Sequence, residues 1–399
     1  MHKCPPSSVY IHFPYCVRKC AYCDFLSFPF CEEEETAYVE ALLSEIRMAP
    51  KWGADLLSRR EEMDPDTLLK SPLQTIYFGG GTPSLMAPSQ LMTILGALRD
   101  AFGITENCEI TLEANPGTID EKKMQALIES GVNRLSLGIQ SLDDSVLRTL
   151  GRIHDADTGR RAIRDAKRAG FRNLSCDLML GIPGQTLKSV KDSIDFLLSE
   201  EIPHISLYSL ILEEGTPMYV RYGGDIEKYV TQEQDREMYH LVTETLTSSG
   251  FVHYEISNMA RPGFESRHNL MYWRAENYYG LGVGAHYYLG DERGRHVETV
   301  PEYIESMRKK DVEKEAVWQA EEILGRDEKR KEFMMLGFRT SDGVREAIFK
   351  ERFGTTMDSV FGAEIQREIE AGLVTAVEGG YRLTKKGVDL ANQVFMDYV

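Results

Sequence analysis

Short apolar runs alternate with longer amphipathic stretches through the first half of the chain. The runs have the length of strands and are Ser8–His12, Thr75–Phe78, Glu109–Glu113, Arg134–Gly138, Ser175–Leu180 and His204–Leu210. The stretches between them repeat apolar residues at helical spacing and are Thr36–Met48, Pro88–Phe102, Asp120–Ser130, Asp155–Ala169 and Thr186–Glu200. Such alternation predicts a parallel sheet with helices outside it. Six units indicate a partial, TIM-like (β/α)6 barrel over residues 1–225 rather than a full eight-stranded one.

The pattern changes in the second half. Residues 226–320 predict an α+β extension, with a helix at Thr231–Ser249 and an aromatic-rich stretch from Phe251 to Leu289. The charged segment Met307–Lys331 predicts an exposed helix and a linker. Residues 321–399 predict a winged-helix-like module: helices around Arg345–Phe353 and Phe361–Ala371, a hairpin turning at Gly379-Gly380, and a closing helix. Because this module carries few basic residues, we expect it to serve structure or partner docking rather than DNA binding.

The net charge argues against nucleic acid as a partner. The 399 residues carry a formal charge of −17 and have a pI of about 5.1, which opposes binding to polyanions and anionic membranes. No apolar run approaches membrane-spanning length, and no secretory leader precedes the first predicted strand. We therefore expect a cytoplasmic protein, in which cysteines stay reduced unless a metal or catalysis uses them.

Three of the seven cysteines lie close together near the start of the chain. Cys16, Cys20 and Cys23 are separated by three and then two residues in YIHFPYCVRKCAYCDF. Three thiols on one short loop suit an iron–sulfur cluster held by three of its irons, which leaves the fourth iron open to another ligand. A zinc or redox site is the alternative, but it would lack a fourth nearby ligand, unless Cys31 served as a spare one. Cys108 and Cys176 lie in apolar runs and are predicted core residues; Cys4 is isolated.

Polar residues and glycines follow the predicted strands at the end where the cysteine loop begins. Functional groups of parallel barrels collect at the carboxyl ends of the strands. Candidates at that rim are Gly80, Gly81 and Thr82 after the second strand, Glu113 on the third, Gln140 and Arg152 after the fourth, and Asp177 on the fifth. A carboxylate, an amide and hydroxyls in one place suit recognition of a ribose and an amino-acid group.

The cysteine spacing, GGGTPS, EANPG, GIQS and GIPGQT together resemble the radical S-adenosylmethionine (SAM) superfamily. The resemblance covers essentially the whole chain and is greatest to the group of oxygen-independent coproporphyrinogen III oxidases and HemW-like haem chaperones. It implies that the three cysteines hold a [4Fe–4S] cluster whose open iron binds SAM through its amino and carboxylate groups. An electron donor such as a flavodoxin or ferredoxin would reduce the cluster, and the cofactor would be cleaved to a 5′-deoxyadenosyl radical.

Motif matching extends this resemblance to individual residues. It implies that Tyr10 and Tyr22 lie beside the cofactor near the cluster, and that Gly80, Gly81 and Thr82 lie at its methionyl end. The positions that contact its ribose and carboxylate match Glu113, Gln140, Arg152 and Asp177.

Two departures from the oxidase pattern favour the chaperone branch. Phe25 stands where the oxidase has a fourth cysteine, and nothing comparable to the oxidase's N-terminal extension precedes Tyr10. We therefore expect a haem chaperone that passes haem to acceptor proteins, which could be membrane-associated. The alternative is a coproporphyrinogen III oxidase or another radical enzyme acting on a tetrapyrrole.

The segment HNLMYW matches a motif that is associated with haem in the HemW-like branch. Its His268 could ligate haem iron, and Tyr272 and Trp273 could pack on the porphyrin. The alternative is a structural histidine within an aromatic cluster. His286 is a second candidate, whereas His12 is expected to be a packed residue near the cluster.

Overall fold

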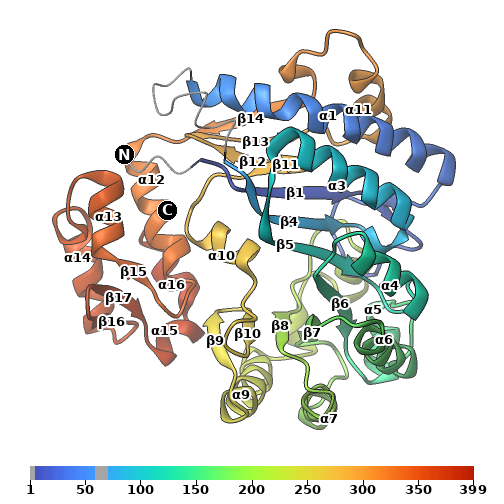
Figure 1. Ribbon diagram of the computed structural model, residues 1–399. Coiled ribbons are helices and arrows are strands. Elements are labelled where there is room, and N and C mark those ends of the chain that lie inside the picture. The colour runs from blue at the N-terminus through green and yellow to red at the C-terminus, as the bar shows by residue number, and fades with distance from the viewer. Residues whose placement is uncertain (1–4, 59–70) are drawn as a thin grey trace.

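The computed structural model describes residues 5–58 and 71–399, and a nine-stranded sheet lies at its centre (Figure 1). Six neighbouring strands run parallel, and they confirm the six predicted ones: β1 (Ser8–Phe13), β4 (Leu73–Gly80), β5 (Ile104–Ala114), β6 (Arg134–Gln140), β7 (Asn173–Leu180) and β8 (His204–Ser209). Their carboxyl ends form one rim, as the predicted barrel requires.

Helices cover the outer face of these strands (Figure 1). They are α1 (Glu32–Ser58), α3 (Pro88–Phe102), α4 (Glu121–Glu129), α5 (Asp144–Leu150), α6 (Ala156–Ala169) and α7 (Leu187–Ser199). Local sequence fixes their ends. In α6, for example, Asp155 accepts a hydrogen bond from the Thr158 amide, and Gly170 closes the helix with φ of +112°. Its apolar stripe, which includes Ile163 and Ala166, is buried against the sheet side.

Strands from the segment 226–320 extend both edges of the sheet. β11 (Tyr279–Leu281) runs parallel to β1, while β10 (Asn258–Ala260) and β9 (Val252–Glu255) lie antiparallel beyond β8. One hydrophobic cluster accordingly runs from Val9 to Trp318. The division of the chain into domains at residue 225 stays a prediction. The helix predicted before these strands is confirmed as α9 (Gln232–Ser248), which Thr231 caps.

The prediction of an exposed helix and linker over 307–331 is wrong for most of that segment, since after Met307 only its end, from Arg326, belongs to an α-helix, α12 (Arg326–Gly337). After α11 (Val300–Met307), this segment forms a 3-10 turn (Lys314–Ala316) and the strand β14 (Trp318–Ile323) before α12 begins. β14 joins β12 (His286–Leu289) and β13 (Glu292–His296) in an antiparallel sheet. Its charged residues lie exposed along a sheet edge, where charges discourage further strand pairing. Its first residue, Trp318, is buried and donates to the Glu45 carboxylate (2.6 Å).

The C-terminal residues form a module with its own core, as predicted. Its helices are α12 (Arg326–Gly337), α13 (Glu346–Phe353), α14 (Met357–Glu370), α15 (Lys385–Asp389) and α16 (Ala391–Met396). Its antiparallel sheet is β15 (Val344–Arg345), β17 (Gly380–Leu383) and β16 (Val374–Val377), and the hairpin turns at the predicted glycines. The module lies beside the barrel, with α10 (Arg267–Trp273) between them (Figure 1).

The remaining elements are short. They are β2 (Tyr15–Cys16), β3 (Phe28–Pro29), α8 (Pro217–Tyr222) and the 3-10 turns Pro83–Leu85 and Ile226–Lys228. Over the described ranges, no helix has both the length and the apolar character that a membrane crossing needs.

Candidate functional site

The cysteine loop is fixed to the rim at both ends. β2 pairs with β3 and closes the loop that carries the three thiols. In its middle, the Ala21 amide donates to the Leu150 carbonyl (3.1 Å) and the Ala21 carbonyl accepts from the Met218 amide (2.9 Å). Arg18 donates to the Gly151 carbonyl (2.9 Å). The loop is therefore clamped between the end of α5 and the start of α8.

Cys16, Cys20 and Cys23 all line one cavity of about 380 Å³. All three are half-buried free thiols, whereas Cys31 is exposed and is not among the lining residues. Cys108 and Cys176 are buried, as predicted, and Cys4 lies outside the described residues. Burial raises the pKa of the Cys23 thiol to about 11, and the neighbouring Cys20 adds to the rise. Metal binding would have to displace this proton.

The donor set fits an iron–sulfur cluster better than a single metal ion. Within residues 5–58 and 71–399, no three His, Cys, Asp or Glu side chains converge on one point as a mononuclear site would need. A cluster asks for a wider spacing because each thiolate ligates a different iron. Three thiols on the wall of one cavity allow that arrangement.

Alternate residues of the strands form the cavity wall. On β6, every second side chain from Arg134 through Ser136 to Gln140 faces it. Glu113 on β5 accepts from the Tyr77 hydroxyl (2.7 Å), and burial raises the pKa of Glu113 to about 7. Asp177 on β7 accepts from the Ser136 hydroxyl (3.2 Å), and its pKa is also raised by burial. The wall thus holds two carboxyl groups whose pKa values burial raises.

A polar network joins this wall to the thiols. Arg152 donates to Cys20 Sγ (3.3 Å), to the Gly138 carbonyl (2.7 Å) and to Asn115 Oδ1 (2.5 Å). Asn115 in turn donates to Thr82 Oγ1 (3.0 Å), and Thr82 donates to Cys16 Sγ (3.4 Å). Cys20 and Cys16 therefore accept hydrogen bonds from Arg152 and Thr82. Both donors are joined through Asn115, directly after β5, while Arg152 is also bonded to Gly138 on β6.

The glycine turn after β4 is needed for packing. Gly80 has φ of +107°, and a Cβ there would lie 2.5 Å from the His12 ring. A Cβ on Gly81 would lie 2.6 Å from the Tyr15 carbonyl oxygen. These glycines let β4 approach the start of the cysteine loop. His12 itself is buried, with Nε2 against the Leu26 carbonyl (2.9 Å), and so lies where a packed residue near the cluster was expected.

Gln140 is the strained residue of the cavity. It has a left-handed backbone with φ of +61°. Its side-chain Oε1 is buried and has no hydrogen-bond partner among the described residues. Strain of this kind and unpaired buried polar atoms both cost free energy and concentrate where a ligand uses them.

The structure brings together all but one of the predicted SAM residues. Tyr22, Gly80, Gly81, Thr82, Glu113, Gln140, Arg152 and Asp177 line the cavity with the three cysteines. Tyr10 does not line it; its ring stacks behind Tyr77 at 6.2 Å. The sequence reasoning missed Tyr77, Asn115, Arg134, Ser136, Tyr208 and Asn269, which also line it. Period two along each strand would have identified most of these residues.

The HNLMYW residues form α10, and His268 is closed off there. It is 1% exposed. Thr75 donates its hydroxyl proton to Ser8 (2.9 Å), so Thr75 accepts from Nδ1–H of His268 (2.8 Å). His268 Nε2 then accepts from the Tyr272 hydroxyl (2.9 Å). Burial lowers the pKa of His268 to about 3, so the ring is neutral and both nitrogens are paired.

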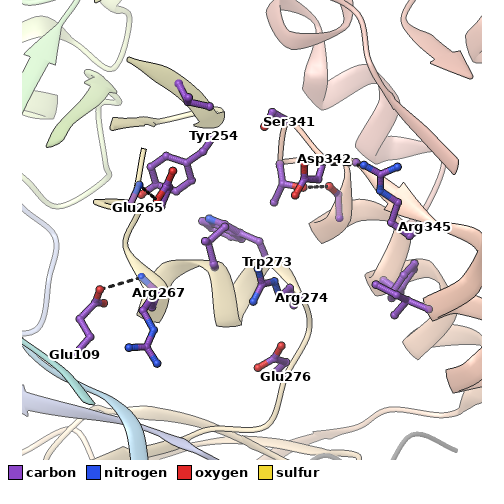
Figure 2. Close-up of a pocket in the computed structure, with 18 of the residues that line it drawn as sticks. Glu109, Tyr254, Glu265, Arg267, Trp273, Arg274, Glu276, Ser341, Asp342 and Arg345 are labelled. Carbon is purple, nitrogen blue, oxygen red and sulfur yellow. Dashed lines mark hydrogen bonds and ion pairs between the residues drawn. The ribbon is translucent and has the colours of Figure 1, made fainter. Parts of the chain in front are cut away.

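Trp273, at the other end of the motif, faces a groove of about 980 Å³ between α10 and the C-terminal module. Figure 2 shows Trp273 and Arg274 opposite Asp342 and Arg345. Trp273 Nε1 is buried without a hydrogen-bond partner among the described residues. His286 lines neither space: its side chain is 57% exposed and lies 3.7 Å from Glu321.

The chain is similar to known proteins along nearly its whole length. Residues 10–197 match the model of the radical SAM superfamily, and residues 324–390 match the HemN C-terminal domain. A Bacillus subtilis protein named "Heme chaperone HemW" is 36% identical, covering 97% of this chain and 98% of that protein. Its namesake from Lactococcus lactis is 33% identical, covering 99% and 97%. "Radical S-adenosyl methionine domain-containing protein 1, mitochondrial" of Mus musculus is 31% identical, covering 98% and 86%.

A solved structure supports the same fold. Coproporphyrinogen III oxidase (HemN) from Escherichia coli superposes with a TM-score of 0.78, covering 99% of this chain and 90% of that chain. The two sequences are 20% identical, so this match concerns the fold alone.

Proposed function

The chain belongs to the HemW family within the radical SAM superfamily, and on this premise we propose that it is a haem chaperone, which binds haem and transfers it to acceptor proteins. The observation that carries the proposal is the match over 97–98% of the length of two relatives named "Heme chaperone HemW". Phe25 agrees with it, because a fourth cysteine is missing at the position where the oxidase has one.

We propose that Cys16, Cys20 and Cys23 hold a [4Fe–4S] cluster and that SAM occupies the cavity beside them. The cluster, when bound, supplies one-electron reduction. The chain's own residues position the ligands: Arg152 and Thr82 orient two of the sulfur atoms. Glu113, Gln140 and Asp177 offer oxygen atoms to hydroxyl and ammonium groups. Tyr22 and the turn Gly80-Gly81-Thr82 complete the wall.

We propose that α10 carries the haem-binding residues. Trp273 supports this most directly, because it lines the groove and its buried indole N–H has no hydrogen-bond partner in the part of the chain that the structure describes. An aromatic face suits a porphyrin. Iron ligation by His268 stays a prediction, since it would break the hydrogen bond between His268 Nε2 and Tyr272.

The proposal includes a cytoplasmic setting, which keeps the cluster thiols reduced, and an electron donor such as a flavodoxin or ferredoxin. The haem acceptor could be a membrane-associated protein. A coproporphyrinogen III oxidase, or another radical enzyme acting on a tetrapyrrole, is the alternative function. The observation that favours it is the match of residues 324–390 to the HemN C-terminal domain.

Anaerobically reconstituted protein tests the proposal. We expect haem addition to shift the Soret band and the loaded protein to pass haem to an apo-acceptor. Trp273→Ala should weaken haem binding about tenfold, which is the loss of one aromatic contact, and Trp273→Phe should restore most of it. Incubation with SAM, a reductant and coproporphyrinogen III should give no protoporphyrinogen. Turnover of coproporphyrinogen would overturn the chaperone function.

A further inference from the structure

Helix α10 reaches the cofactor cavity from the side opposite the cysteines. Two glutamates lie four residues apart on β5 and face inward. Glu109, in the middle of the strand, accepts from the backbone amides of His268 (3.1 Å) and Arg267 (3.2 Å), and Figure 2 shows the bond to Arg267. Glu113, nearer its end, lines the cavity, and so does Asn269 of α10. One helix is thus tied to the middle of β5 and also forms part of the cavity wall.

The His268 ring is coupled to Glu113 through a single side chain. His268 stacks on Tyr77 with 5.1 Å between ring centroids and 27° between planes. The Tyr77 hydroxyl donates to Glu113 Oε1 (2.7 Å). Since His268 is itself held by Thr75 and Tyr272, its ring has one fixed position. That position limits where the Tyr77 ring, and therefore the Glu113 carboxyl group, can lie.

We infer that α10 is the floor of the SAM cavity and that His268 is a positioning residue for Glu113, acting through Tyr77. This rests on the proposed function, because it takes SAM as the ligand of the cavity. The motif residues thereby divide between two tasks. His268 positions a residue of the cofactor cavity and Asn269 lines that cavity, whereas Trp273 lines the groove.

The outer end of α10 is held by the C-terminal module. Arg352 donates to the Arg274 carbonyl (2.7 Å), and the Arg339 guanidinium lies 4.3 Å from the Trp273 ring centroid. A ligand in the groove and SAM in the cavity therefore contact the same short helix. If one changes the other's affinity, the reverse effect must have the same size.

The test is the affinity for SAM, measured by equilibrium dialysis on the cluster-loaded chain. His268→Asn keeps a donor toward Thr75 but removes the ring above Tyr77, and we expect it to raise the Kd about tenfold, the effect of one misplaced hydrogen bond. Tyr77→Phe should do the same. Both substitutions act on Glu113 through the same path. The Kd of the double variant for SAM should therefore be no higher than the larger of the two Kd values of the single variants.

Two further variants separate positioning from a general loss of structure. His268→Phe keeps an aromatic face over Tyr77 and should restore the Kd to within about threefold of wild type. His204→Asn is the matched control. His204 is equally buried between Ser175 (2.7 Å) and the Tyr254 hydroxyl (2.8 Å), but it is not among the cavity residues. It should lower thermal stability and leave the Kd within about twofold, since it touches no ligand.

The outcomes distinguish this inference from the proposed function. If His268→Asn bound SAM with wild-type affinity, the positioning role of His268 would be overturned and the proposed function would stand. The same would follow if the increases in Kd of the two single variants multiplied in the double variant. An equal loss of affinity in His204→Asn would do so as well. A wild-type chain that binds haem but no SAM would overturn the cofactor assignment and, with it, this inference.

Discussion

The two ends of the central strands treat their polar groups in opposite ways. At the rim, Gln140 has a strained backbone and a buried side-chain oxygen that no other described residue pairs with, beside three free thiols. At the floor, both nitrogens of His268 are paired, and both Glu109 carboxylate oxygens accept backbone amides of α10. Unpaired buried groups cost stability, and paired ones preserve it. The rim is therefore built to receive ligands, whereas the floor is built to hold a position.

The largest expected effect concerns the rim thiols. Cys20→Ala should abolish the cluster, because two thiolates cannot hold three irons. The reconstituted variant should contain almost no iron and lack the visible charge-transfer band. Cys31→Ala is the control, since Cys31 is exposed and lies outside the cavity. It should retain about four irons. A tightly bound zinc ion and no iron–sulfur band in the wild type would contradict the cluster.

A substitution in the floor should lower the stability of the protein. His268→Ala removes the acceptor of the Tyr272 hydroxyl and the donor to the Thr75 hydroxyl, which keeps only Ser8, and it creates a cavity. We expect the free energy of unfolding to fall by about 3 kcal/mol. Urea denaturation of the metal-free chain measures it. A change below about 0.5 kcal/mol, the size typical of surface substitutions, would show that the floor is not a supporting network.

The rim could be predicted from the sequence because its signals are local. The cysteines, GGGTPS and EANPG each lie within a few residues of a strand end, and the alternation of strands and helices placed those ends together. On β6, however, only Gln140 was predicted, although Arg134, Ser136 and Gly138 face the same cavity. The alternation of side chains was visible in that run, but the same residues are equally compatible with a strand buried in the core.

The floor could not be predicted because its partners are distant in the sequence. His268 pairs with Thr75 across 193 residues, and no local pattern records that contact. The residue types of HNLMYW suggested an iron ligand, whereas burial and the two hydrogen bonds decide what the ring can do. β14 failed for a similar reason. Its charges suggested a linker, whereas backbone pairing with β13 makes it a strand whose first residue, Trp318, is buried against Glu45.

A smaller effect on stability should follow from the titration of Glu113, which lies between the rim and the floor. Burial raises the pKa of Glu113 from its usual value near 4.5 to about 7, with Asp177 adding to the rise and Tyr77, the Gly80 amide and Arg134 opposing it. The folded chain therefore keeps a proton that the unfolded chain releases above pH 4.5. The contribution of Glu113 to stability must therefore fall as the pH rises from about 4.5 to 7 and then level off.

Glu113→Gln removes this titration. Relative to wild type, the cofactor-free variant should gain roughly 2 kcal/mol between pH 5 and pH 8. Urea denaturation at the two pH values measures the difference. If the two chains showed parallel pH profiles, Glu113 would not be the group that titrates.

The smallest effect tests whether strain at the rim serves binding. Gln140→Gly relieves the left-handed backbone and removes the unpaired Oε1, so we expect a gain of about 1 kcal/mol in the free energy of unfolding together with weaker SAM binding. Ala275→Gly is the matched control, because Ala275, just beyond α10, also has a positive φ of 49° and lies outside the cavity. It should gain similar stability with unchanged affinity. Calorimetry gives the stabilities and equilibrium dialysis the affinities. If Gln140→Gly bound SAM as tightly as wild type, the strained oxygen would have no ligand to serve, and the contrast between rim and floor would fail at this residue.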